Sequence, residues 1–75
     1  MPVHYEEYTE AALFRSIRNH KKRIAEHKDK ITHPAKYVHD WHIRTIEYRQ
    51  GAIKHWLAEI KNFEFQISQA QKELP

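Results

Sequence analysis

The sequence predicts an all-α fold, an antiparallel two-helix hairpin, and three observations carry this prediction. Isoleucine recurs at every seventh position on two separate stretches, first at Ile17, Ile24 and Ile31 and then at Ile46, Ile53, Ile60 and Ile67. This spacing keeps one helix face against a partner helix over several turns. The chain has a single glycine, Gly51, whereas a β domain needs repeated turn residues. Pro34 is the one proline away from the ends, which leaves one break between two helices.

The first helix is expected at about 10–31. Thr9 is a suitable N-cap, Glu10 places negative charge in the first turn, and Tyr8 with Leu13 has the spacing of a hydrophobic staple. Its inward row, in alternating steps of four and three, is Leu13, Ile17, His20, Ile24, His27 and Ile31. We expect His20 and His27 to be residues at the edge of the core that shield this row.

The connector is expected at about 32–42, because the step from His33 to Pro34 disfavours helical geometry at His33. The second helix should then cover about 43–73, with either Thr45 or Asp40 as its N-cap. Its inward row is Ile46, Arg49, Ile53, Trp56 with Leu57, Ile60, Phe63, Ile67 and Ala70. The antiparallel pairing predicted from the isoleucines is Ile31 with Ile46, Ile24 with Ile53 and Ile17 with Ile60, which would place His20 beside Trp56 and Leu57.

A chain of 75 residues forms one domain, 1–75, with a small core. Domains below about 70 to 80 residues rarely gain more than about 3 to 5 kcal/mol from their core without a disulfide, a metal or a partner. The chain has no cysteine, which excludes disulfides and thiolate zinc sites. We therefore expect self-association, as a dimer that forms a four-helix bundle.

A second stripe lies roughly opposite the inward row of the second helix and consists of Tyr48, Gly51, Ala58 and Phe65. One interpretation is that the connector folds back over Gly51 and that Phe65 is a scattered exposed aromatic. The other is that a second copy or another protein packs on this stripe. A mid-helix glycine favours the second interpretation, since it costs about 1 kcal/mol relative to alanine and permits close backbone approach.

The histidines are the residues that most resemble a chemical site. His33, His39 and His42 gather in and after the connector, next to Asp40, and imidazole with carboxylate suits zinc or nickel. No HExxH motif or cysteine pair frames them, so we expect neither a metal site nor a cofactor. We also expect no enzyme, although a ribonuclease using His39 or His42 beside Lys36 is an alternative.

Basic residues concentrate on the first helix. From residue 15 to residue 30 seven basic residues face two acidic ones, whereas residues 46–75 hold four of each. The basic face comprises Arg15, Arg18, Lys21, Lys22, Arg23 and Lys28. Such asymmetry is typical of contact with a phosphate backbone, and also of a solvated helix face. The aromatic residues do not interleave with the basic ones, so nucleic-acid binding is the alternative function rather than the first.

Location and membrane contact follow from hydropathy. No apolar run reaches the length of a membrane span, and residues 1–10 are acidic and aromatic, unlike a signal peptide. We expect a cytoplasmic protein without membrane contact, in keeping with the lack of cysteine.

Residues 17–67, about two thirds of the chain, contain the three stretches IAEHKDKI at 24–31, HPAKYVHDW at 33–41 and YRQGAIKHWLAEI at 48–60. With these stretches the segment resembles helical segments near the C-termini of bacterial polymorphic toxins and related secreted effectors. Those relatives tend to read Asp-Pro where this chain has Arg44, Thr45 and Ile46. The resemblance implies a bacterial or mobile-element protein acting as an interaction or accessory module. The function predicted is a non-enzymatic, self-associating protein-interaction module with an unknown protein partner.

Overall fold

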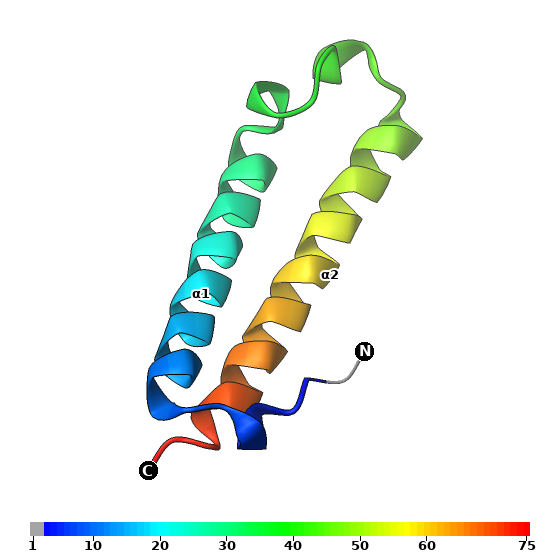
Figure 1. Cartoon of the computed structure of the whole chain (residues 1–75). Coiled ribbons are helices and arrows are strands. Elements are labelled where there is room, and N and C mark those ends of the chain that lie inside the picture. The colour runs from blue at the N-terminus through cyan, green and yellow to red at the C-terminus, as the bar shows by residue number, and fades with distance from the viewer. Residues whose placement is uncertain (1–2) are drawn as a thin grey trace.

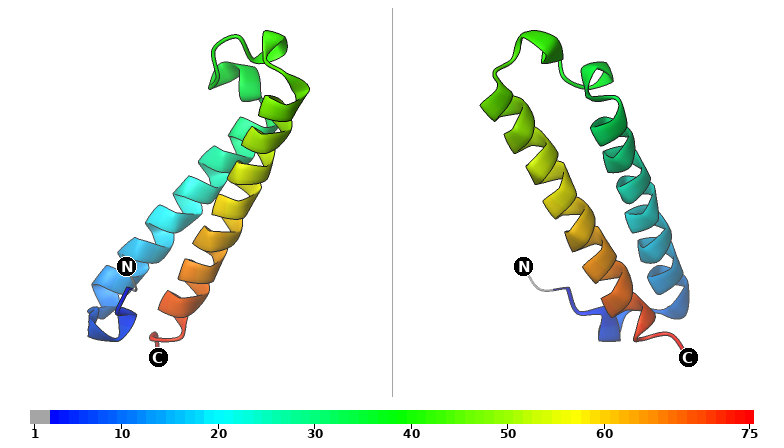
Figure 2. Two further views of the ribbon diagram at one scale, coloured as in Figure 1. Left: turned by 90° about the vertical axis from the view of Figure 1, so that its right-hand side faces the viewer. Right: turned by 180° about the vertical axis from the view of Figure 1, so that it is seen from behind.

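The computed structural model describes residues 3–75, and it is an antiparallel pair of long helices. Helix α1 spans Glu10–Thr32 and helix α2 spans Ile46–Gln71, and the two lie side by side along their length (Figures 1 and 2). Three short 3₁₀ turns, Tyr5–Glu7, Pro34–Lys36 and Trp41–Ile43, flank and connect them. The described residues contain no strand, so the predicted all-α hairpin is confirmed.

Threonine caps the first turn of each helix. The Thr9 Oγ1 atom accepts a hydrogen bond from the Ala12 backbone N–H at 3.1 Å, and Thr45 does the same for Tyr48 at 3.1 Å. Each bond satisfies a backbone donor that has no partner inside its helix. Asp40, the alternative cap, instead precedes a 3₁₀ turn in a left-handed conformation, φ 57°, without a side-chain cap bond.

The connector begins where His33 leaves helical geometry, at φ −129° and ψ 62°. The turn that follows Pro34 folds back on α1, where the Tyr37 hydroxyl donates to Asp29 and Lys36 Nζ lies 3.3 Å from the same carboxylate. These contacts hold the pKa of Asp29 below its usual range, first through the Tyr37 hydrogen bond and then through that of Lys36.

The core at the end holding the chain termini contains Tyr5, Leu13, Ile17 and Ala70, with Ile67 and Leu74 packed against them. Tyr8 was expected to pack on Leu13, and the tyrosine that joins Leu13 in this buried cluster is Tyr5. Tyr5 supplies the buried ring, while Tyr8 is exposed and packs edge-on against Tyr5, with 5.1 Å between ring centroids. The 3₁₀ turn at Tyr5–Glu7 carries the chain back across the helix ends and makes this possible.

The predicted helix register is wrong. His27 contacts Glu59, where the isoleucine pairing would have placed Gln50, a shift of nine residues. The Phe63 ring lies between His20 and His27, 5.8 and 5.2 Å from their centroids, so His20 is not beside Trp56 and Leu57. The shift equals about two and a half turns. Its cause is the connector, which allows the first turns of α2 to extend beyond the end of α1.

Two residues that were expected inside are exposed. Ile46 is 60% exposed because α2 begins beyond the end of α1, and Leu57 is 49% exposed because it lies about 100° around the helix from buried Trp56. The inward row of α1 is confirmed: Leu13, Ile17 and His27 are buried, and His20, Ile24 and Ile31 are half-buried. The rest of the α2 row, from Arg49 to Ala70, is buried or half-buried.

Candidate interaction surfaces

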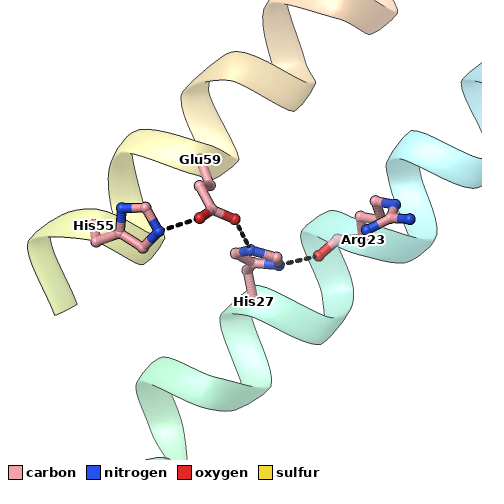
Figure 3. A network of polar contacts seen from close by, with 4 residues as sticks. All are labelled: Arg23, His27, His55 and Glu59. Atoms are coloured by element: carbon pink, nitrogen blue, oxygen red, sulfur yellow. Dashed lines mark hydrogen bonds and ion pairs between the residues drawn. The ribbon is translucent and has the colours of Figure 1, made fainter. Parts of the chain in front are cut away.

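One side of the groove between the helices is occupied by polar contacts. His27 is buried; its Nδ1 lies 2.9 Å from the Arg23 carbonyl oxygen, and its Nε2 contacts a Glu59 carboxylate oxygen (Figure 3). The other carboxylate oxygen of Glu59 contacts His55 Nε2, one turn away on α2. This side carries His20, His27, Glu59 and Gln66, and we call it the histidine face.

Both ring nitrogens of His27 face oxygen atoms that accept hydrogen bonds. An imidazole donates to both only when both nitrogens carry a proton; otherwise Glu59 must carry the proton between them. The hydrogen bond from His27 holds the pKa of Glu59 below its usual range, and nearby His55 and His27 add to this effect. This contact between His27 and Glu59 bridges the two helices.

The N-terminal segment covers the rest of the histidine face. The Tyr5 hydroxyl donates to Gln66 Oε1 at 2.9 Å, and His20 Nε2 lies 3.4 Å from the same hydroxyl oxygen. Burial lowers the pKa of His20, and the nearby Arg23 charge lowers it further. His20 is thus a neutral residue at the core edge, as expected.

The other side of the groove is apolar, and we call it the isoleucine face. It is formed by Ile17, Ile24 and Ile31 of α1 and Ile46, Ile53 and Ile60 of α2. Ile17 and Ile60 are buried, Ile24, Ile31 and Ile53 are half-buried, and Ile46 is exposed. Exposed Phe14 and Leu57 continue the apolar surface outward. Large apolar side chains that stay exposed beside buried ones favour a surface that packs against another molecule.

The predicted stripe on α2 lies outside the hairpin, and all four of its residues, Tyr48, Gly51, Ala58 and Phe65, are exposed. Gly51 has no neighbour within 4 Å of the position that a Cβ would take, so the connector does not fold over it. Tyr48 is held between Trp41, 6.5 Å away, and the Arg44 guanidinium, 4.8 Å from its ring. Beside it an open, mainly apolar groove is lined by Glu47, Tyr48, Gly51, Ala52, His55 and Trp56.

All six basic-face residues, Arg15, Arg18, Lys21, Lys22, Arg23 and Lys28, are exposed. At 100° per residue they spread over about 220° of the α1 circumference rather than forming a narrow stripe. The geometry therefore resembles a solvated helix surface more than a track that follows one phosphate backbone.

The connector histidines do not converge. His33, His39 and His42 are all exposed, and the only contact that the described residues give them with a carboxylate is the one from His39 to neighbouring Asp40, at 3.1 Å. Between residues 3 and 75, no group of three histidine or carboxylate side chains is placed to hold a metal ion.

In the same part of the chain, no helix has the length and apolar character needed to cross a membrane.

Sequence reasoning missed four residues that define these surfaces: Tyr5, Trp41, His55 and Glu59. The spacing of His55 and Glu59, four residues apart on a helix, indicated that they could pair, but only the true register brings His27 to Glu59.

Comparisons of the chain with protein-family models, with curated proteins and with solved structures find no match.

Proposed function

We propose that this chain is a small, non-enzymatic interaction module that self-associates and presents the outward stripe of α2 to another protein. The observation that carries the proposal is the bare backbone at Gly51 within a stripe of exposed residues. A mid-helix glycine costs roughly 1 kcal/mol relative to alanine, and nothing inside the hairpin requires it. Close approach of a partner backbone gives that glycine a role.

The neighbouring side chains support the same surface. Phe65 is 57% exposed, and Tyr48 is fixed by its contacts with Trp41 and Arg44. A fixed aromatic side chain loses little conformational freedom when a partner binds, which favours its use as an anchor. Self-association is supported by the apolar residues left uncovered on the isoleucine face of so small a domain.

The test is affinity purification of the tagged chain from its native cells, with co-purified proteins quantified for four forms. The wild type should retain a partner that Phe65→Asp and Gly51→Leu both lose. The matched control is Arg15→Gln with Lys22→Gln and Arg23→Gln, which removes three charges away from the stripe and should keep the partner. A partner retained by both stripe variants would eliminate this surface.

Nucleic-acid binding is the second candidate, supported by six exposed basic side chains on α1. If it is the function, fluorescence anisotropy with a labelled duplex or single strand should show tight binding. That binding should weaken steeply as salt rises, and the triple glutamine variant should have a shallower salt slope. We expect weak binding only, because the charges are spread around the helix.

A toxin-associated module of bacterial or phage origin is a further form of the same proposal, and it rests on the resemblance of residues 17–67. The neighbouring genes distinguish these origins. An adjacent immunity gene supports toxin biology, and surrounding phage genes support a binder directed at a host protein.

A further inference from the structure

The two sides of the hairpin groove differ in what covers them. Residues seven apart lie in nearly straight rows along a helix. His27 contacts Glu59, and Tyr5 joins His20 to Gln66, so the rows that contain these residues share one side. The isoleucine rows therefore lie on the opposite side, the isoleucine face. The N-terminal segment and the contact between His27 and Glu59 occupy the histidine face, and the isoleucine face retains its exposed apolar residues.

Charged residues border the isoleucine face in a regular way. On α1, Lys21 and Lys28 follow Ile17 and Ile24 by four residues. On α2, Leu57 and Glu64 follow Ile53 and Ile60 by the same spacing. Residues four apart are neighbours on a helix surface, so these side chains edge the face. One border is thus basic and the other is apolar and acidic.

The register places the residues of the two borders at similar positions along the helix axes. Phe63 contacts both His20 and His27, so it lies level with the midpoint between them. Glu64 is then level with residue 22 or 23, within about 3 Å along the axis from Lys21. In the same way Leu57 is level with residue 29 or 30, within about 3 Å along the axis from Lys28. Among residues 3–75 neither Lys21 nor Glu64 takes part in an ion pair.

We propose that a second copy of this chain covers the isoleucine face, with a twofold axis parallel to the helices, so that α1 of each copy packs over α2 of the other. This inference rests on the self-association proposed above and assigns its surface and geometry. A rotation about that axis leaves the position of every residue along the helix axes unchanged. Lys21 then faces Glu64 of the second copy, and the Lys28 stem covers Leu57 of the second copy.

Charge selects this arrangement over the other simple twofold packing. With the axis perpendicular to the helices, α1 packs on α1 and the row of Lys21 and Lys28 meets its own copy. Like charges in that position oppose association, whereas the parallel axis pairs opposite charges twice in each dimer. The stripe at Gly51 and Phe65 stays outside this interface and remains open to another protein.

The decisive experiment uses two single variants, Lys21→Glu and Glu64→Lys, studied alone and mixed in equal amounts. In either homodimer two repulsive contacts replace two attractive ones, so each variant alone should dimerise about tenfold more weakly. In the mixed dimer both contacts join opposite charges again. Sedimentation equilibrium should show the mixture restored to within about threefold of the wild type. A pairing within one chain cannot produce this rescue.

Three further variants locate the interface independently. Leu57→Asp should weaken dimerisation about 100-fold, because the dimer contains the change twice and each buried leucine contributes at least about tenfold. Phe65→Asp, on the outward stripe, should leave dimerisation within about threefold of the wild type. The same is expected of Lys22→Glu, because Lys22 is next to Lys21 in sequence but points away from the isoleucine face. Circular dichroism establishes that each variant is helical.

The outcomes separate this inference from the proposed function. A wild-type dimer that loses affinity in Phe65→Asp but not in Leu57→Asp, or whose mixed charge variants show no rescue, overturns the assigned geometry and leaves self-association standing. A wild type that is monomeric at every concentration overturns both.

Discussion

Trp41 of the connector stacks on Trp56 of α2, with ring centroids 5.9 Å apart and planes inclined by 23°. Both side chains are buried, although one belongs to a 3₁₀ turn between the helices. The connector therefore contributes to the core through Trp41, which packs on Trp56 near the end of α1.

This relationship predicts that the two tryptophans contribute similarly to stability. Trp41→Ala and Trp56→Ala should each lower the free energy of unfolding by about 3 to 5 kcal/mol, and the double variant by less than the sum, since the rings share one contact. Urea denaturation measures all three. Ile43→Ala, at an 80% exposed connector position, is the control and should change stability by less than about 0.5 kcal/mol. A negligible effect of Trp41→Ala would contradict a packed connector.

His20 should make the hairpin sensitive to mild acid. Burial, aided by Arg23, holds its folded pKa below the usual value near 6.5, so the unfolded chain takes up the proton first. The stability contribution of neutral His20 is complete above about pH 6.5 and is lost as pH falls below that value. His20→Gln should therefore show a smaller loss of stability between pH 7 and 5.5 than the wild type. Equal slopes in the two proteins would exclude this role for His20.

Glu59 should govern a second, more acidic transition. Its pKa is lowered first by the hydrogen bond from His27, so its contribution is present above its unfolded pKa, about 4.5, and is lost as pH falls through the lower folded value. Urea denaturation from pH 6 to pH 3 should show this loss in the wild type. Glu59→Gln should lack it, and His27→Gln should reduce it, because the lowering depends on the His27 donor. If His27→Gln kept the full acid transition, the contact between His27 and Glu59 would not be its cause.

Gly51 separates folding from binding. Gly51→Ala should raise the stability of the isolated chain by roughly 1 kcal/mol, because the site is helical and has open space for a Cβ. Thermal unfolding measures this gain. If a partner backbone approaches Gly51 closely, the same substitution should weaken partner binding while it strengthens the fold. A destabilised Gly51→Ala would show that the glycine serves the hairpin itself.

Local signals in the sequence predicted the helices well. Thr9 and Thr45 cap α1 and α2 as short polar side chains do at helix starts, and the seven-residue spacing of Ile17, Ile24 and Ile31 identified the inward side of α1. Both features depend on residues within one or two turns, so they can be read without knowledge of the tertiary fold.

The register could not be predicted in this way, because it depends on the path of the connector. Matching isoleucine with isoleucine assumed that each apolar residue buries itself against another. Instead His27 pairs with Glu59, and Trp41 covers Trp56. The interaction between His27 and Glu59 joins residues far apart in sequence, and no spacing rule within one helix indicates it. For the same reason the isoleucine face was recognised only once both helices were placed.

Sedimentation equilibrium of the wild type measures whether two copies associate through the hairpin. Loaded at concentrations from about 1 to 200 µM, the protein should fit a reversible equilibrium between monomer and dimer. The melting temperature should rise with concentration, as mass action requires for an assembly that stabilises the fold. A concentration-independent monomer that unfolds cooperatively would rule out self-association, because it would show that one hairpin core suffices.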